Sequence, residues 1–299
     1  MKKSLIFLLL LLFPIIVSSQ IRVQIGGASD APKETLDTAI VRIGYAAYSV
    51  IDTTKRDKPS EDYLVLEIGT KYSKYYSDNV RRRDSLMSAV INNNGAGLDV
   101  NRLRSLNMSE LLASSGIKSG GNGDVVLKKL TENKLSYFGQ IGMSKYEYEE
   151  PLGEMQWEIQ PDTMTILSFL CQKATTTFRG RVFEAWFAAE IPIFSGPWKF
   201  HGLPGLILKV SDSNNEFRFE CVDITQESSP IIHTKDNYLK TSRKDYMNVQ
   251  KKHHNDPMGS IRASMPQGAN VVMRNIDESG RATDVGENFK IPYNPIELD

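Results

Sequence analysis

One stretch decides the fold of this 299-residue chain: residues 179–210, RGRVFEAWFAAEIPIFSGPWKFHGLPGLILKV. Between residues 181 and 191 the odd positions after Arg181 are apolar, whereas the even positions are mixed. Because strand side chains alternate between the two faces of a sheet, this segment is predicted to be a strand with one buried face and one face open to water. Residues 206–210 begin a second strand, and a loop dense in aromatic residues connects the two.

The loop, residues 192–205, is predicted to be rigid because proline and glycine recur along it. These residues are Pro192, Gly196, Pro197, Gly202, Pro204 and Gly205. Pro204 and Gly205 fit the two central positions of a type II turn, since proline presets φ at the first and glycine supplies a positive φ at the second. We therefore expect this turn to lead into the second strand.

The second strand is predicted to turn back on itself. Residues 212–215, DSNN, form a turn cluster, and residues 216–224 again have a strand pattern. The register that keeps both apolar rows on one face pairs Val210 with Phe217, Leu208 with Phe219 and Leu206 with Cys221. A slip by one residue would put the two rows on opposite faces. The alternation falters at Asp223, which indicates a strand end or a bulge.

The loop ends in Gly202-Leu203-Pro204-Gly205-Leu206-Ile207, and this motif resembles the one that names the GLPGLI family of bacterial envelope proteins, found mainly in Bacteroidota. The chain is also similar to this family at residues 178–181, 185–186, 190–192, 196–198 and 293–298. The resemblance implies export and a β-rich fold. The structural motif residues that it implies are Arg179, Gly180, Pro197, Gly202, Pro204 and Gly205. It implies no reaction, because the family has no established one.

Residues 1–19 have the features of an export signal. Lys2 and Lys3 give a positive start, and the apolar run that follows is shorter than the about 20 residues of a membrane-spanning helix. We expect the signal to be cleaved before Gln20 and the mature protein to be located in the periplasm, on the outer-membrane surface or in the medium. No later stretch is apolar enough to cross a membrane, so no integral membrane segment is predicted after removal of the signal.

The chain has 36 basic and 36 acidic residues, a balance that argues against a nucleic-acid partner. Its length allows a single β-rich domain over residues 20–299. The predicted fold is mainly β, a β-rich α+β fold: a curved antiparallel sheet or half-barrel with a few peripheral helices. Residues 92–123, rich in Asn, Gly and Ser, are predicted to form a mobile excursion from the sheet.

Further elements follow from local patterns. Strands are predicted at residues 39–49, 63–69, 135–138, 146–148, 155–159, 163–174 and 261–273. A helix capped by Ser77 or Asp78 is predicted between the first and later strands, and another helix at residues 242–254.

The two cysteines, Cys171 and Cys221, leave two alternatives open. Export to an oxidising compartment and an even number favour a disulfide. In a simple meander, however, their strands are three apart, or about 14 Å at the usual strand spacing, whereas a disulfide needs Cα atoms within about 7 Å. The alternatives are therefore a bridge, which requires the sheet to curl or the strand order to differ, and two buried free thiols.

Candidate chemistry is confined to the histidines and to carboxylates near them. His201 with a carboxylate such as Glu184 or Glu190 could form an acid–base pair, and residues 253–256, HHND, suggest a metal site. Adjacent helical residues do not share a face, so at most one of these two neighbouring histidines could join a common site. No nucleophile, zinc or phosphate-binding motif is present, and we predict no catalytic residue, no cofactor and no metal.

The aromatic loop supports two interpretations. In the first, its aromatic side chains fold inward and close one end of the sheet core. In the second, they present a pre-organised binding surface, with Trp186, Trp198, Phe200, His201 and Leu203 as the candidate binding residues. We expect a non-catalytic envelope protein that binds a peptide, a protein partner or an apolar ligand with the sheet and this loop. The alternative is a periplasmic hydrolase that uses His201 or the His253 region with nearby carboxylates.

Overall fold

The structure is a computed structural model that describes residues 6–8, 31–92, 108–117, 121–263, 274–276, 282–284, 286 and 289–299. Its strands are β1 (Ile6–Leu8), β2 (Lys33–Thr38), β3 (Val41–Ser49), β4 (Ser60–Ile68), β5 (Tyr72–Ser77), β6 (Val125–Lys129), β7 (Lys134–Ile141), β8 (Ser144–Pro151), β9 (Glu158–Ile166), β10 (Phe169–Phe178), β11 (Arg181–Ala188), β12 (Leu206–Asp212), β13 (Phe217–Gln226), β14 (Pro230–Thr234), β15 (Leu239–Lys240), β16 (Arg274–Ile276) and β17 (Ala282–Asp284). Its helices are α1 (Asp78–Asn92), α3 (Met108–Ser114), α4 (Arg243–Asn255) and α5 (Pro257–Ala263). The chain is mainly β, as predicted.

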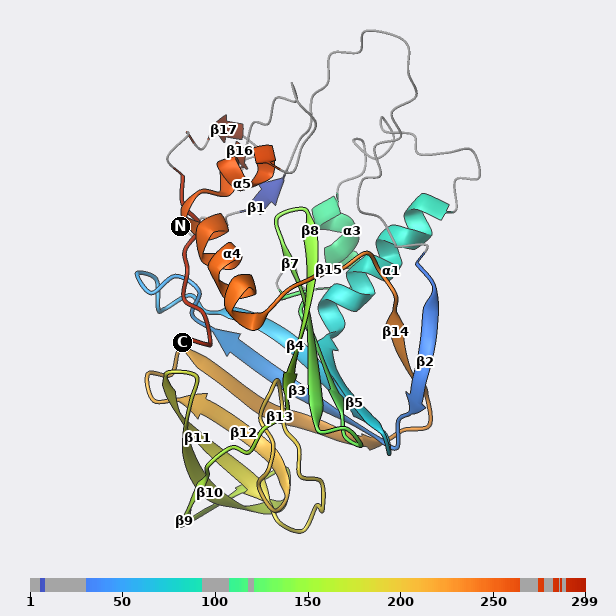
Figure 1. Cartoon of the computed structure of the whole chain (residues 1–299), viewed down its shortest axis with the longest axis vertical. Helices are drawn as coiled ribbons and strands as arrows, with labels where there is room; N and C mark the ends of the chain where they lie inside the picture. The colour runs from blue at the N-terminus through green and yellow to red at the C-terminus, as the bar shows by residue number, and fades with distance from the viewer. Residues whose placement is uncertain are drawn as a thin grey trace, which may run out of the picture.

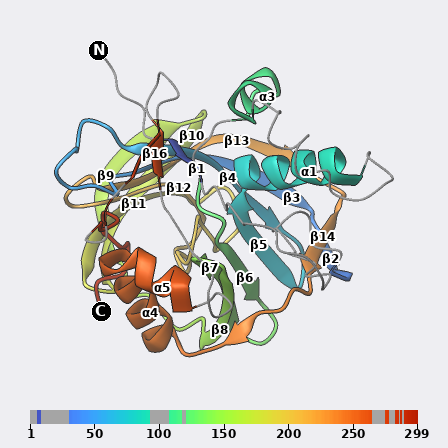
Figure 2. The ribbon, with the colours of Figure 1, turned by 90° about the horizontal axis from the view of Figure 1, so that it is seen from above.

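Twelve strands form one sheet in the order β15-β8-β7-β6-β5-β4-β3-β13-β12-β11-β10-β9. Its neighbouring strands are antiparallel except β15 and β8, which are parallel. Seen from above, the strands follow an arc around a common interior (Figure 2). Because β15 and β9 remain as edges, the sheet is open, and the predicted curved antiparallel sheet or half-barrel is confirmed.

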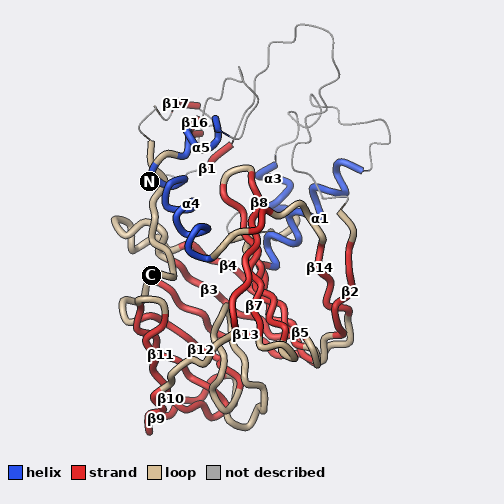
Figure 3. The backbone as a smooth tube through the Cα atoms, in the orientation of Figure 1, coloured by secondary structure: helices blue, strands red, loops and turns tan. Residues whose placement is uncertain are grey.

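The remaining elements are peripheral. Strands β2 and β14 form a separate pair, and β1, β16 and β17 form a small three-stranded sheet. The described helices lie toward one end of the large sheet, with α4 and α5 near the C-terminus and α1 beside β4 and β5 (Figures 1 and 3). The sheet therefore carries the core, and the helices cover parts of its rim.

The apolar side chains of the sheet form one hydrophobic core. Phe183 of β11, Leu208 of β12 and Phe219 of β13 are all buried, which confirms the predicted alternation along these strands. The core also takes Tyr45 of β3, whose hydroxyl donates a hydrogen bond to the carbonyl of Ile207 in β12 (2.8 Å). Burial of these side chains against one another is the main source of stability in such a sheet.

The predicted hairpin of β12 and β13 forms, but its register differs from the predicted one by two residues. Val210 pairs with Phe219 instead of Phe217. A shift of two residues keeps the same face buried, so the apolar pattern could not distinguish the two registers. The turn determines the register of the hairpin, because Asp212 Oδ1 accepts hydrogen bonds from the backbone N–H groups of Glu216 and Phe217 (2.7 and 2.8 Å).

The single strand predicted at residues 163–174 was wrong. The segment is a hairpin of β9 and β10, because Leu167 and Ser168 both adopt a positive φ (49° and 73°) and reverse the chain. Two consecutive residues with positive φ are typical of a type I′ turn, which usually contains Asn, Asp or Gly. Leucine and serine gave no such signal, so the reversal was invisible in the sequence.

The turn at Pro204 and Gly205 is tighter than the predicted type II turn. The N–H of Gly205 donates to the carbonyl of Leu203 (2.8 Å), which closes a three-residue turn around the proline. The N–H of Leu206 donates to Ile191 across the loop (3.1 Å). In a type II turn that N–H would bond to the carbonyl of Leu203 instead. The loop thus ends in a strand-like contact with the segment that follows β11.

Both helix starts agree with the prediction. Ser77 accepts a hydrogen bond from the N–H of Val80 at the start of α1 (3.1 Å). Ser242 caps α4 by accepting from the N–H of Asp245. The irregularity at Asp223 is a bulge in the pairing of β13 with β3, one of the two alternatives that the sequence left open.

Several predictions fall wholly or partly on residues that are not described. Residues 261–273 were predicted as a strand, but α5 extends to residue 263, so the prediction was wrong there, and residues 264–273 lie outside the described part. Of the predicted signal peptide only residues 6–8 are described, and of the predicted excursion at 92–123 only residues 92, 108–117 and 121–123. Cleavage and mobility stay predictions.

Cys171 of β10 and Cys221 of β13 are buried free thiols in the structure, which is the second of the two alternatives for the cysteines. Strands β11 and β12 lie between their strands. Burial raises the pKa of Cys171 to about 11 and that of Cys221 to about 12. Because the thiolate is the reactive form, both thiols are unreactive at neutral pH.

Candidate functional site

The aromatic loop folds inward. Trp198, Phe200 and Leu203 are only 6%, 0% and 1% exposed. The ring of Phe200 packs edge-on against Phe183 and Trp198, with ring centroids 4.8 and 5.3 Å apart. This favours the first interpretation of the loop and corrects the second for Phe200 and Leu203, which have no surface to present. Trp186 is half-buried on β11 and does not line the cavity that lies inside the arc of the sheet.

Two buried lysines hold the loop from two sides. Lys128 of β6 donates a hydrogen bond from Nζ to the carbonyl of Phe200 (2.8 Å). Lys199, in the loop itself, lies 2.5 Å from the carboxylate of Glu297. Trp198, the residue directly before Lys199, has a φ of 51°, a left-handed conformation that bulky residues rarely adopt. Such a conformation persists only where the surroundings enforce it, so the loop is a rigid support for the indole ring.

Lys128 makes the stability of the protein depend on pH. Burial lowers the pKa of Lys128 to about 7, whereas an unfolded lysine has a pKa of about 10.4. Between these values the unfolded state binds more protons, so the free energy of unfolding rises with pH. We expect the wild type to gain about 2 kcal/mol from this group between about pH 7 and pH 9, and Lys128→Met to lack that gain.

Urea unfolding of both proteins at the two pH values measures this difference. The matched control is Lys134→Met, because Lys134 lies exposed on the neighbouring strand β7. The control should follow the wild type. If Lys128→Met gains as much stability with rising pH as the control does, the lysine is not held at a lowered pKa.

His201 is not placed for acid–base catalysis. Its Nδ1 lies 2.8 Å from the carbonyl oxygen of Lys199, and its Nε2 lies 2.9 Å from the carbonyl oxygen of Gly153. Burial lowers the pKa of His201. Among the described residues, neither Glu184 nor Glu190 is a hydrogen-bond partner of the ring, so the acid–base pair considered from the sequence does not form. His201 anchors the loop instead.

The histidines of α4 support no metal site either. Nδ1 of His254 lies 2.9 Å from the carbonyl of Pro292, and its ring packs against Tyr293 at a centroid distance of 4.7 Å. His254 thereby holds the C-terminal segment against α4. Within the described ranges, no group of three or more His, Cys, Asp or Glu side chains could hold a metal ion. Nδ1 of His253 is buried without a hydrogen-bond partner among the described residues.

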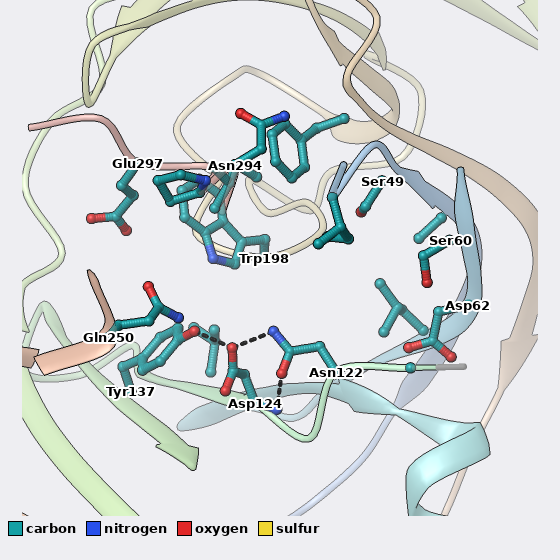
Figure 4. A pocket seen from close by; sticks show the side chains of 18 of the residues that line it. Ser49, Ser60, Asp62, Asn122, Asp124, Tyr137, Trp198, Gln250, Asn294 and Glu297 are labelled. Carbon is teal, nitrogen blue, oxygen red and sulfur yellow. Dashed lines mark hydrogen bonds between the residues drawn. The ribbon is translucent and has the colours of Figure 1, made fainter. Parts of the chain in front are cut away.

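A cavity of about 430 Å³ lies inside the arc of the sheet. Its walls come from the inner faces of β3–β8 and β13, from the loop at Trp198, from α4 and from residues 292–297. We call it the aromatic cavity, because it is lined by Tyr75, Tyr137, Tyr148, Trp198, Phe217, Phe219, Tyr246 and Tyr293. Figure 4 shows Trp198 on one side of this space and Tyr137 on the other.

The charged groups of the cavity wall are mainly carboxylates. Asp124 faces the interior and accepts hydrogen bonds from the hydroxyl of Tyr137 and the amide of Asn122 (Figure 4). Burial raises the pKa of Asp124 to about 6, against the opposing effect of these hydrogen bonds. Asp62 projects from β4 at another part of the wall. No lysine or arginine is found among the described residues that line the cavity, so it is aromatic and acidic.

The C-terminal segment lines one side of the cavity, and the motif residues hold this segment. Arg179 and Gly180 form the turn between β10 and β11, both with positive φ (50° and 77°). The carbonyl of Arg179 accepts a hydrogen bond from the N–H of Leu298 (2.9 Å). Arg181 donates to the carbonyl of Pro295 (2.8 Å). The stretches that carry the family resemblance, 178–181 and 293–298, therefore meet in space and have a structural role.

The sequence pointed to Trp198 but missed the rest of the cavity wall. Tyr75, Tyr137 and Tyr246 belong to β5, β7 and α4, elements that are far apart in the chain and have ordinary amphipathic patterns. Such a pattern shows which face of an element is buried, but not whether the buried faces fill the space between them. The available signal was the number of tyrosines, 12, because a buried tyrosine needs a partner for its hydroxyl.

Comparison with known proteins agrees with the family resemblance. Residues 179–209 match the family model described as "Protein of unknown function (Porph_ging)", which confirms the predicted resemblance over this stretch. No curated protein matches the chain. Two solved structures of PNGF-II, in different crystal forms, are similar to 73% of the chain at 13% sequence identity, with TM-scores of 0.48 and 0.47. The chain spans about a third of those chains, 34% and 33%.

Within the described residues, no helix is both long enough and apolar enough to cross a membrane.

Proposed function

We propose that this protein, which carries the Porph_ging signature over residues 179–209, is an exported, non-catalytic protein of the cell envelope that binds a small apolar ligand in the aromatic cavity. The cavity is the observation that carries the proposal. Its volume of about 430 Å³ falls in the range of about 300–1,000 Å³ that is usual for small-molecule sites. Of its 27 lining residues, 16 are aromatic or aliphatic and ten are polar or charged, so the wall is mainly apolar with polar groups set into it, as in many small-molecule sites.

The rigidity of the wall supports the proposal. Lys128 and Lys199 fix the loop that carries Trp198, and Arg181 fixes the C-terminal segment that lines the cavity. A wall that is already ordered loses little conformational entropy when a ligand binds, which favours affinity. An interior space also suits a small molecule better than a protein partner, because a protein interface needs about 800 Å² of accessible surface on each side.

Export is the second part of the proposal and rests on residues 1–19. A positive start, a short apolar run and small residues before Gln20 are the pattern of a cleaved signal. Fractionation of cells that express the full chain, with N-terminal sequencing of the product, tests this part. A mature protein that begins at Met1 in the cytoplasm would contradict it.

Filling the cavity is expected to abolish ligand binding. Ser49 projects into the aromatic cavity from the end of β3 and is half-buried (Figure 4). The bulky indole of Ser49→Trp would occupy the space that a ligand needs. With N-phenyl-1-naphthylamine, a neutral apolar fluorophore, we expect a rise in emission with the wild type and at least about a tenfold loss of affinity in the variant.

Ser136→Trp is the matched control for this experiment. Ser136 is half-buried on β7, next to Tyr137 in the chain, but it does not line the cavity. The control should therefore bind the dye like the wild type. Equal binding to all three proteins would show that the dye binds elsewhere, and no binding to the wild type would contradict the proposed function.

A further inference from the structure

Two buried oxygen atoms at one part of the aromatic cavity have no hydrogen-bond partner among the described residues: Oδ2 of Asp62 and the hydroxyl of Tyr75. Tyr75 is 5% exposed, and both residues line the cavity. They are close enough that the Asp62 carboxylate, after burial itself, contributes to raising the pKa of Tyr75 well above its ordinary value. Buried polar atoms are nearly always hydrogen-bonded in folded proteins, so this pair indicates where a bound group belongs.

The negative charge at this place is not neutralised by the described residues. The other oxygen of Asp62, Oδ1, accepts hydrogen bonds from Ser77 Oγ and Asn79 Nδ2 (both 2.9 Å), and both donors are neutral. No ion pair joins Asp62 to a described residue, and the described part of the cavity wall has no lysine or arginine. A partly buried carboxylate without a counter-charge is unfavourable, and a cation in the cavity would relieve this.

We propose that the ligand of the aromatic cavity is a small organic cation, an ammonium group on an apolar body, and that Asp62 and Tyr75 receive the ammonium group. This inference rests on the proposed function and names its ligand class. An ammonium group has several donors and no acceptor, which suits a place where the unpartnered oxygens can only be satisfied by a donor. The apolar body then fills the space toward Trp198, and the aromatic rings attract a cation through their faces.

An anionic ligand does not fit this site. Its charge would approach Asp62 and Asp124, and no lysine or arginine among the described wall residues could compensate. The buried ion pair of Lys199 with Glu297 is already closed within the protein at 2.5 Å, so that lysine is not free for a ligand. The charge distribution of the wall thus selects cations over neutral molecules and neutral molecules over anions.

Three probes with the same aromatic body test the inference: 1-naphthylmethylamine, 1-naphthylmethanol and 1-naphthylacetate. At about pH 7.5 the first is a cation, the second is neutral and the third is an anion. By titration calorimetry we expect the amine to bind the wild type at least about tenfold more tightly than the alcohol, because a hydrogen bond to a charged group is stronger than one between neutral groups. The anion should bind most weakly.

Two conservative variants locate the ammonium group. Asp62→Asn keeps an oxygen that can accept the hydrogen bonds from Ser77 and Asn79, but it removes the negative charge. This variant should abolish the preference for the amine over the alcohol while leaving binding of the alcohol unchanged. Tyr75→Phe should weaken binding of the amine by about two- to tenfold. Glu61→Gln, at the exposed neighbour of Asp62 on β4, is the control that should change nothing.

The outcomes separate this inference from the proposed function. If the alcohol binds as well as the amine, if the anion binds best, or if Asp62→Asn keeps the preference for the amine, the cation inference is overturned and the apolar cavity site stands. If none of the three probes binds the wild type, the proposed function fails and the inference fails with it.

Discussion

Replacing Arg181 by methionine is expected to lower the free energy of unfolding by about 3–5 kcal/mol, the usual effect of breaking a buried ion pair by removing one partner. Nη1 of Arg181 lies 3.1 Å from Oδ2 of Asp212 and 2.8 Å from Oε2 of Glu216. All three side chains are at least nine-tenths buried. The variant would leave two buried carboxylates with reduced compensation. It would also release the carbonyl of Pro295, which Arg181 holds at 2.8 Å.

Denaturant unfolding of Arg181→Met beside Arg218→Met measures this effect. Arg218 of β13 has a side chain that is 39% exposed and lies 3.6 Å from Glu220. A surface pair of this kind contributes only about 0–1 kcal/mol, so the control should change stability little. Equal losses in the two variants would show that the Arg181 cluster does not stabilise the fold.

The ion-pair cluster around Arg181 is also expected to make the free energy of unfolding fall at acidic pH. Burial alone would raise the pKa of Glu216, but the hydrogen bonds from Arg181, Asn294 and Arg56 outweigh it and lower that pKa. The folded state therefore binds fewer protons than the unfolded state, and the stabilisation is lost as the pH falls below the unfolded value of about 4.3. In Arg181→Met this acid-dependent loss should be smaller than in the wild type, because much of the stabilisation is already absent.

Gly205→Ala is expected to cost about 2–5 kcal/mol, for two reasons that add. The backbone of Gly205 has a φ of 154°, which L-residues rarely adopt. A Cβ atom there would also lie 2.2 Å from the carbonyl oxygen of Ala188 and 2.8 Å from Cα of Ala189. Both contacts are with backbone atoms at and just after the end of β11, which cannot rotate away as a side chain can.

Gly202→Ala in the same motif separates the two reasons. Gly202 also has a positive φ, 88°, but a Cβ atom there would have no neighbour within 4 Å. This variant carries only the backbone strain, about 1 kcal/mol. Chemical unfolding with equal m-values compares the two stabilities directly. If both variants lose the same stability, the close approach at Gly205 has no energetic importance.

Local patterns predicted the strands and helix starts well where the chain gives a chemical signal. Phe183 and Phe219 are buried as the alternation required, Ser77 caps the first helix as predicted, and the helix predicted at residues 242–254 forms after Ser242. The failures occurred where the signal was missing or ambiguous. Leu167 takes a left-handed conformation without being a turn residue, and a register shift of two residues leaves the apolar pattern unchanged.

The candidate site was predictable only in part. Trp198 stood out because tryptophan in a stiff loop is a common binding anchor, and it does line the cavity. His201 also stood out, but both of its ring nitrogens face backbone carbonyls. Asp62 and Tyr75 gave no signal, because a single carboxylate or tyrosine in a strand pattern is ordinary. Their importance comes from the partners that they lack in the fold.

The sequence by itself determined the secondary structure of most strands, the inward face of the sheet and the family signature at residues 179–209, since these depend on the order of neighbouring residues. Tertiary structure alone decided that residues 293–298 meet the 178–181 turn and that an acidic aromatic cavity remains inside the curved sheet. The physical reason is that closure, burial of charge and unfilled volume are set by distances between residues far apart in the chain, and periodicity along the chain does not encode those distances.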